Sequence, residues 1–169
     1  GALPPKRDSV LTFLGSHPID LLMWYLGDIE RVYCEADTFT WGRNEGGPFD
    51  SAIVTLRFTS GAIATVRTIW STGGTPFRVR LELEVLGRNG MIQCSTLDEG
   101  FRIYSTGKGY ELPISYEWRP GVTRELKHFL DCIRNDSEPL ITGEMALKTL
   151  RVTLAAERSA REKRPVTID

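Results

Sequence analysis

The sequence predicts an α+β domain, with a largely antiparallel open sheet and helices packed on one face of that sheet. Between residues 50 and 114 apolar and polar side chains alternate, which is the pattern of strands that have one face buried. Beyond residue 120 the apolar side chains recur instead at the spacing of one helical face. Strands grouped together and followed by helices are typical of the α+β class.

A short helix is expected over residues 16–26, ahead of these strands. Ser16 or His17 can cap its start, and Pro18 suits the first turn because the N–H that proline lacks has no partner there. Gly27 can adopt the left-handed conformation that ends a helix. One face of this helix carries the apolar residues Ile19, Leu22, Met23 and Leu26, and another face carries His17, Asp20 and Trp24.

His17 is the candidate chemical group of this helix. The partial positive charge at a helix N-terminus disfavours protonation of a histidine, so the imidazole is expected to be neutral and able to accept a proton. Asp20, three residues later, is placed to orient the ring. The alternative is a capping histidine beside a solvated aspartate. A metal site explains the pair less well, because the chain has two histidines and no third ligand at a suitable spacing.

Seven strands are expected after the helix, and the apolar residues 10–14 before it form either another short strand or the approach to the helix. Ser60-Gly61 and Asn89-Gly90 are turn sequences, and residues 42–48 read as a loop. The expected strands are residues 31–41, 50–58, 62–70, 79–85, 91–94, 101–104 and 110–114. In the second of them, Ala52, Val54, Leu56 and Phe58 face the core, and Ile53, Thr55 and Arg57 face the other way.

Two helices and an edge strand are expected to complete the domain, and both helices should cover the apolar face of the sheet. The first spans residues 123–135, and its His128 lies among charged residues and is expected to be solvated. Thr142 caps the second, and residues 165–168 form the edge strand. The side chains expected on the buried faces are Leu126, Phe129, Leu130 and Ile133 in the first helix, and Met145, Leu147, Leu150, Leu154, Ala155 and Ser159 in the second.

Composition limits the classes of function. The 169 residues are 41% hydrophobic and 25% charged, which is enough for one real core. A formal net charge of -1 gives no broad electrostatic reason to bind nucleic acid or an anionic membrane, and no apolar run approaches membrane-spanning length. Three cysteines far apart in the sequence argue against a disulfide framework and favour reduced thiols in a cytoplasmic protein.

Four segments, taken in order, resemble motifs of one enzyme family. Residues 15–27 resemble a G-x-H-x-x-D-x-x-x-W-x-x-G segment, and residues 50–62 resemble a D-x-a-x-v-x-l-x-F-x-x-G-A hairpin. Residues 83–92 resemble an e-i-x-G-x-x-G-x-i turn, and Glu125 with Phe129 and Ile133 resembles a late E-x-x-x-F-x-x-x-I helix. Together they resemble the C-terminal domain of the glucose–fructose oxidoreductase/inositol dehydrogenase/rhizopine-catabolism family, whose fold is of the glyceraldehyde-3-phosphate-dehydrogenase-like C-terminal type.

The resemblance implies a function for the chain. It implies the substrate-binding and oligomerisation domain of an NAD- or NADP-dependent dehydrogenase of a sugar, polyol or related hydroxy compound. The family's N-terminal Rossmann domain, which binds the cofactor, has no counterpart here, because the chain contains no G-x-G-x-x-G fingerprint and no early Glu-Lys-Pro. Residues 1–9 are expected to be a linker or an engineered lead, and residues 10–169 a single domain. This chain alone is expected to be inactive.

The resemblance also implies roles for individual residues. His17 would bind or deprotonate the substrate hydroxyl, with Asp20 as its orienter. The family has an aspartate four residues before the histidine, where this chain has Phe13. Independently of the resemblance, a Gly-rich loop follows both Trp41 and Trp70, so the two could line a sugar-sized cleft in which Trp70 contacts the substrate, although such residues more often cap the end of a sheet. No residue is expected to bind the cofactor or a metal.

The second face of the sheet is either an ordinary solvated face or a subunit interface, and the resemblance favours a homo-oligomer formed through it. Opposite charges paired across strands would then set the register. The residues expected on this face are Arg57, Thr65, Arg67, Arg78, Arg80, Glu82 and Glu84. The rival functions are a non-catalytic dimerisation domain, for which Phe13 would mark the loss of proton-relay chemistry, and a free-standing ligand-binding domain.

Overall fold

The computed structural model describes residues 9–39, 47–70, 81–95, 100–105, 108–113 and 118–168. The chain divides into two compact units, each with its own antiparallel sheet. The first unit comprises Gly1–Thr75 and Leu140–Asp169, and the second comprises Pro76–Pro139. The α+β class with open antiparallel sheet is confirmed, with two four-stranded sheets where the sequence predicts one. The assignment of residues 10–169 to a single domain stays a prediction.

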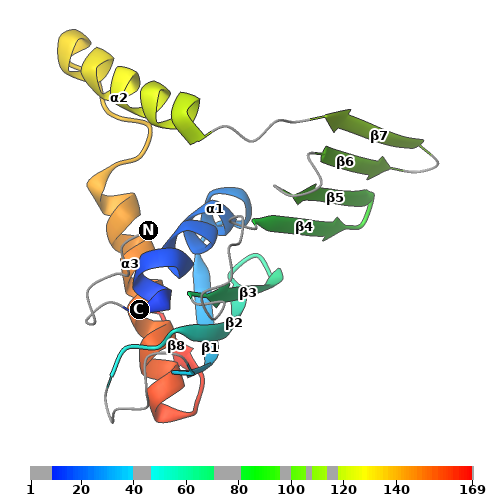
Figure 1. Ribbon diagram of the computed structural model, residues 1–169, viewed down its shortest axis with the longest axis vertical. Coiled ribbons are helices and arrows are strands. Elements are labelled where there is room, and N and C mark those ends of the chain that lie inside the picture. Colours follow the sequence, from blue (N-terminus) through cyan, green and yellow to red (C-terminus); the bar gives the residue numbers. More distant parts are fainter. Residues whose placement is uncertain are drawn as a thin grey trace. The chain divides into compact units, whose positions relative to one another are not determined.

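The sheet of the first unit has the strand order β3-β2-β1-β8, and every pairing in it is antiparallel (Figure 1). Gly61 makes the turn between β2 and β3 with a φ of +87°, a conformation that glycine adopts without strain. Both the turn at Ser60-Gly61 and the final edge strand are therefore as predicted. The strands are β1 (Ile29–Asp37), β2 (Ser51–Phe58), β3 (Ile63–Ile69) and β8 (Val166–Thr167).

Strand β2 confirms the alternation predicted for it. Its core-facing side chains are at most 2% exposed, whereas Ile53 on the opposite face is 54% exposed. Burial of only one face fixes the register, because a shift by one residue would exchange the two sets of side chains. The core-facing residues of β2 are Ala52, Val54, Leu56 and Phe58.

Helix α3 (Gly143–Glu162) packs against β1, so one predicted helix does cover the sheet (Figure 1). Thr142 caps it as expected, since the Thr142 hydroxyl accepts a hydrogen bond from the Met145 amide at 3.4 Å. The predicted buried face is right only for its small residues, since Ser159 is buried and Ala155 half-buried, and it is wrong for the four larger apolar ones. Residues 145, 147, 150 and 154 are exposed, and the buried side chains are Thr149, Val152, Thr153, Ala156, Ser159 and Ala160. Most of the buried side chains are small, which lets the helix lie close to the strand.

Ser159 ties α3 to the neighbouring strands. Its hydroxyl accepts a hydrogen bond from the Cys34 amide of β1 at 3.0 Å and donates one to the Arg164 carbonyl at 2.7 Å. The Cys34 side chain is fully buried beside this contact. Burial raises the pKa of the Cys34 thiol to about 12, because the thiolate would lose its hydration.

We expect Cys34 to resist thiol reagents in the folded protein. At pH 8 the thiol is neutral and shielded, so Ellman's reagent should modify half-exposed Cys94 first and Cys34 only after unfolding. The raised pKa also destabilises the fold in alkali. The unfolded thiol ionises near pH 9 and the folded one near pH 12, so stability contributed by Cys34 is complete below pH 9 and is lost between these values. Rapid labelling of Cys34 in the native protein, located by peptide mapping, would contradict the expected protection of its thiol.

The second unit contains the sheet β4-β5-β6-β7, also antiparallel throughout, and one helix. The hairpin between β4 and β5 turns at Arg88-Asn89 and not at Asn89-Gly90, because Gly87 pairs with Gly90. Gly90 is required for another reason: a Cβ atom there would lie 2.1 Å from the Tyr104 carbonyl oxygen of β6. The elements are β4 (Glu82–Gly87), β5 (Gly90–Ser95), β6 (Gly100–Ser105), β7 (Lys108–Pro113) and α2 (Trp118–Asn135).

Helix α2 begins five residues earlier than the sequence predicts. Its expected apolar face is exposed and not buried, with Leu126, Phe129, Leu130 and Ile133 all between 50% and 62% exposed. His128 is exposed, as predicted, and its Nε2 lies 3.6 Å from the Cys132 sulfur. Among the described helices, none is both long and apolar enough to cross a membrane.

Candidate functional site

The helix that carries His17 starts differently from the prediction. A π-helical segment η1 (Leu11–Gly15) runs directly into α1 (Ser16–Leu26). Gly15 has a right-handed helical conformation and no side chain caps α1, so capping by Ser16 or His17 is wrong. The widened turn comes just before Pro18, which has no N–H to continue an α-helical ladder. Gly27 ends α1 as expected and has a positive φ of 89°, but its ψ of -158° lies outside the left-handed helical region that the sequence predicts.

This continuous helix changes the electrostatic argument for His17. Helical conformation begins at Val10, so His17 lies about two turns into the helical segment. The helix dipole acts mainly within the first turn, so the dipole argument made for His17 does not apply at this position. The division of faces is confirmed, because Ile19 and Leu22 are buried whereas the His17 side chain is exposed. His17 is therefore exposed on a helix whose opposite face is buried.

Asp20 holds α1 against α3. Its Oδ1 atom accepts a hydrogen bond from the Thr149 hydroxyl at 2.7 Å. Thr149 is 6% exposed, and its hydroxyl also lies 3.3 Å from the Met145 carbonyl oxygen. The hydrogen bond that the structure shows for Asp20 thus goes to Thr149. The role of Asp20 in orienting His17 stays a prediction.

We expect the Asp20–Thr149 hydrogen bond to contribute to stability. Thr149→Val removes the donor while keeping the shape, and Asp20→Ala removes the acceptor. Each change should lower the free energy of unfolding of the complete protein by about 1–2 kcal/mol. The double variant should lose clearly less than the sum, as measured by urea unfolding of all four proteins. Additive losses would show that the two groups do not interact.

Trp70 lies at the end of β3 and contacts Phe13 of the helical segment. The rings of Phe13 and Trp70 are 4.6 Å apart between centroids and inclined by 61°. Phe13 is 50% exposed and Trp70 is half-buried, so both keep accessible aromatic surface. Trp41, the other tryptophan predicted for the cleft, lies outside the described residues, as do Arg78 and Arg80.

Sequence reasoning missed the structural role of Asp50, which anchors the chain around Trp70. The Asp50 side chain is 2% exposed, and its carboxylate oxygens lie 3.0 and 3.1 Å from the Phe39 amide, which donates to them. The Asp50 carbonyl accepts a hydrogen bond from the Trp70 amide at 2.8 Å. The sequence offered one sign of this role: Asp50 directly precedes an alternating strand, and a carboxylate that is buried there must be hydrogen-bonded.

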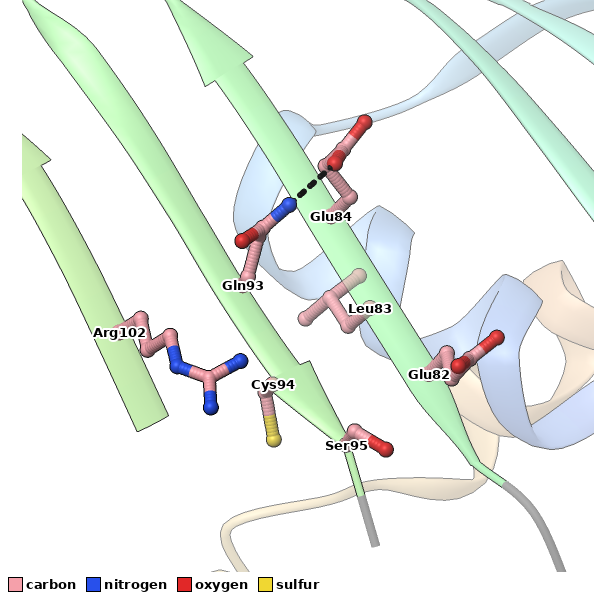
Figure 2. A pocket seen from close by; sticks show the side chains of 7 residues that line it. All are labelled: Glu82, Leu83, Glu84, Gln93, Cys94, Ser95 and Arg102. Atoms are coloured by element: carbon pink, nitrogen blue, oxygen red, sulfur yellow. Dashed lines mark hydrogen bonds between the residues drawn. The ribbon is translucent and has the colours of Figure 1, made fainter. Parts of the chain in front are cut away.

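The second unit has a separate polar hollow of about 400 Å³ on its sheet. Figure 2 shows Glu84 accepting a hydrogen bond from the Gln93 side chain of the next strand, at 2.7 Å. Arg102 pairs with Glu111 across β6 and β7 at 3.0 Å, a cross-strand pair of the kind predicted for this face. The residues that line the polar hollow are Glu82, Leu83, Glu84, Gln93, Cys94, Ser95 and Arg102. In the described parts of the chain no three histidine, cysteine or acidic side chains are grouped to hold a metal ion.

The chain thus has an α+β fold with antiparallel sheets. Its candidate site is the exposed His17 on helix α1 of the first unit. The chain belongs to the family described as "Oxidoreductase family, C-terminal alpha/beta domain", because the sequence profile of that family matches residues 4–168. The resemblance to the glucose–fructose oxidoreductase/inositol dehydrogenase/rhizopine-catabolism family is thereby confirmed.

Dehydrogenases are among its relatives. The chain is 30% identical over 127 residues to the scyllo-inositol 2-dehydrogenase (NAD(+)) of Bacillus subtilis strain 168, covering 73% of this chain and 36% of that protein. It is 24% identical over 160 residues to the myo-inositol 2-dehydrogenase of Thermotoga maritima, covering 90% and 47%. An Agrobacterium radiobacter oxidoreductase, crystallised with NAD+, L-tartaric acid and magnesium, shares the fold with a TM-score of 0.76 at 21% identity, over 92% of this chain and 48% of that one. The chain thus spans less than half the length of each.

Proposed function

We propose that the complete protein is a nicotinamide-dependent dehydrogenase of a sugar, polyol or related hydroxy compound. This chain would supply its substrate-binding and oligomerisation domain. The observation that supports this most strongly is the position of His17: it matches the family's histidine and is exposed on a helix whose other face is buried. The two inositol dehydrogenases among the relatives support a polyol as substrate.

The nicotinamide cofactor, NAD or NADP, would be held mainly by another domain. A dinucleotide site of the Rossmann type needs a parallel β-α-β unit, and both sheets in the described residues are antiparallel. We therefore assign no residue of this chain to the cofactor. When bound, that cofactor accepts the hydride from the substrate carbon.

His17 would take part in the accompanying proton transfer. Oxidation of an alcohol to a carbonyl compound removes the hydroxyl proton together with the hydride. A neutral imidazole nitrogen can accept a hydrogen bond from that hydroxyl and then its proton. Phe13 stands where the family has an aspartate and cannot take the proton further. The exposed His17 ring would instead release it to water.

The test is a cofactor-binding titration on the protein expressed from its native start codon, with this chain as the control. Nicotinamide fluorescence should report binding of NADH or NADPH by the complete protein and not by this chain. Oxidation of sugars and polyols is then screened by the absorbance of the reduced cofactor. Absence of cofactor binding by the complete protein would overturn the dehydrogenase and favour a non-catalytic dimerisation or ligand-binding domain.

We also propose that the outer face of the β3-β2-β1-β8 sheet joins two copies of the protein. Ile53, Ile63 and Ile69 are more than half exposed on this face, around the paired Thr55 and Thr65. A sheet face with this much exposed aliphatic surface gains stability when a partner covers it. The same copy-to-copy contact would join two active sites in one soluble assembly of the cytoplasm.

Charge also suits this face to a specific contact. The carboxylate of Glu35 accepts hydrogen bonds from the Tyr33 hydroxyl and, at 3.1 Å, from Lys163. These contacts hold the pKa of Glu35 below its ordinary value, so it remains charged near neutral pH. Lys163 balances the charge of Glu35, and Arg57 and Arg67 lie opposite Ile63 and Ile53 on the same face, so a partner would need polar or acidic groups beside its apolar ones.

Sedimentation should therefore show a dimer or larger oligomer of the complete protein at micromolar concentration. Ile53→Lys places a charge at the exposed centre of β2 and should weaken association at least tenfold, because the charge would have to be buried in the contact. Ile53→Val keeps the face apolar and should sediment like the original protein. A monomer well above micromolar concentration would contradict the interface.

A further inference from the structure

We propose that His128 and Cys132 of helix α2 bind a zinc ion as a two-residue chelate. We call these two side chains the His–Cys pair. The inference goes beyond the proposed function and does not rest on it, because the pair takes no part in the proposed dehydrogenase reaction. It places a metal ion where the sequence predicts only a solvated histidine and a reduced thiol.

The first observation is the distance between the two ligand atoms. His128 Nε2 lies 3.6 Å from the Cys132 sulfur, and His128 Nδ1 lies 4.0 Å from it. In tetrahedral zinc sites the Zn–N bond is about 2.0–2.1 Å and the Zn–S bond about 2.3 Å, which places the bound nitrogen and sulfur about 3.6 Å apart. The His–Cys pair therefore already has the separation of two ligands on one ion. Because the imidazole is exposed, it can rotate to aim the Nε2 lone pair at that ion.

The second observation is that the helix fixes the spacing of the His–Cys pair. The two residues are four positions apart, so their side chains are neighbours on one face of α2. The end of the helix also holds the backbone of Cys132. Asp136 has a left-handed φ of 48°, and the Ser137 amide donates a hydrogen bond to the Cys132 carbonyl at 3.0 Å. A chelate whose ligands are held by the backbone loses little entropy when it binds an ion.

The third observation is the different burial of the two ligands. Cys132 is 8% exposed, whereas His128 is exposed. An ion can thus reach the pair from solvent at the imidazole, while the sulfur is shielded from larger reagents. The Cys132 sulfhydryl donates to the Glu138 carbonyl at 3.7 Å, a weak contact that a metal–sulfur bond would replace. On binding, the thiol proton passes to water and the thiolate binds the ion.

The donor atoms select the kind of ion. Thiolate sulfur and imidazole nitrogen suit zinc, whereas magnesium and calcium are bound by oxygen ligands. Within the described residues no third histidine, cysteine or acidic side chain is grouped with the pair. Water would therefore occupy the remaining coordination positions. We expect affinity in the micromolar range, because two protein ligands bind zinc more weakly than the four of a closed structural site.

The test is a titration of the complete, reduced protein with Co²⁺, followed by Zn²⁺. Cobalt can replace zinc in a tetrahedral site, and its bond to a thiolate gives an absorption band in the near ultraviolet. We expect this band to saturate at micromolar Co²⁺ and to disappear when Zn²⁺ displaces the cobalt. Cys132→Ser should abolish the band, and His128→Ala should weaken Co²⁺ binding about tenfold or more.

Two control variants separate the His–Cys pair from other thiols and histidines. Cys94→Ser removes a half-exposed thiol outside the pair and should leave the titration unchanged. Lys127→His combined with His128→Ala retains a histidine but moves it off the face of Cys132, so it should not restore binding. Three outcomes would each overturn the chelate: no thiolate band in the original protein below millimolar Co²⁺, a band that survives in Cys132→Ser, or original affinity in folded His128→Ala.

Discussion

Replacing His17 by alanine in the complete protein is expected to lower kcat about 10²- to 10⁴-fold, the usual contribution of a general acid or base. The hydroxyl proton must leave as the hydride does, and alanine offers no acceptor for it. The fold should persist, because the His17 side chain is exposed and α1 is anchored through buried Ile19 and Leu22. Steady-state kinetics on the substrate found by screening, with circular dichroism of the same samples, measures both effects.

Two further variants show which property of His17 matters. His128→Ala makes the same substitution at the chain's other histidine, on an exposed face of α2, and should leave kcat within twofold. His17→Gln keeps a hydrogen-bonding side chain that cannot accept a proton. A loss in kcat as large as that of His17→Ala would assign proton transfer to His17, and a rise in KM alone would assign substrate binding. Unchanged kcat and KM in His17→Ala would remove His17 from the mechanism.

Local chemistry explains the parts of the fold that the sequence predicts well. The alternation in β2 is visible because one face is fully buried and the other meets solvent, so each position has one preferred polarity. The Thr142 cap and the turn at Gly61 are equally local, since the groups involved lie within a few residues of each other. Such features need no knowledge of the rest of the chain.

The features that depend on distant contacts were not predicted correctly. Leucines on α3 suggested its buried face, but the close approach to β1 selects Thr153, Ala156 and other small side chains. Asp20 pairs with Thr149, 129 residues away, and no local pattern indicates that partner. Gly90 looked like a turn residue, yet its need for space comes from the Tyr104 backbone on another strand.

The candidate site divides in the same way. His17 and Trp70 could be singled out by motif and by residue type, and both lie exposed or half-exposed in the first unit. Phe13 and Trp70 lie 57 residues apart in the sequence, so sequence spacing could not reveal the contact between them. The helix dipole argument failed because the π-helical segment moved the true start of the helix to Val10.

Phe58→Ala is expected to be the most damaging core substitution, with a loss of about 3–5 kcal/mol. Phe58 is fully buried at the end of β2, and its amide donates to the Ala62 carbonyl at 3.0 Å across the turn. Alanine keeps that backbone bond and removes the ring, so the cost is lost burial plus a cavity. Native-state hydrogen exchange in the complete protein should show β1 and β2 amides exchanging about 10²- to 10⁴-fold faster.

Phe39→Ala is the control that separates burial from residue type. Phe39 is 69% exposed, and its amide, which donates to Asp50, is unaffected by removal of the side chain. The expected cost is within about 0.5 kcal/mol, because little apolar surface leaves the interior. If both variants exchange equally fast, Phe58 does not anchor the sheet. If only Phe58→Ala opens β1 and β2, the sheet that supports Trp70 is stabilised mainly by its α3-facing core.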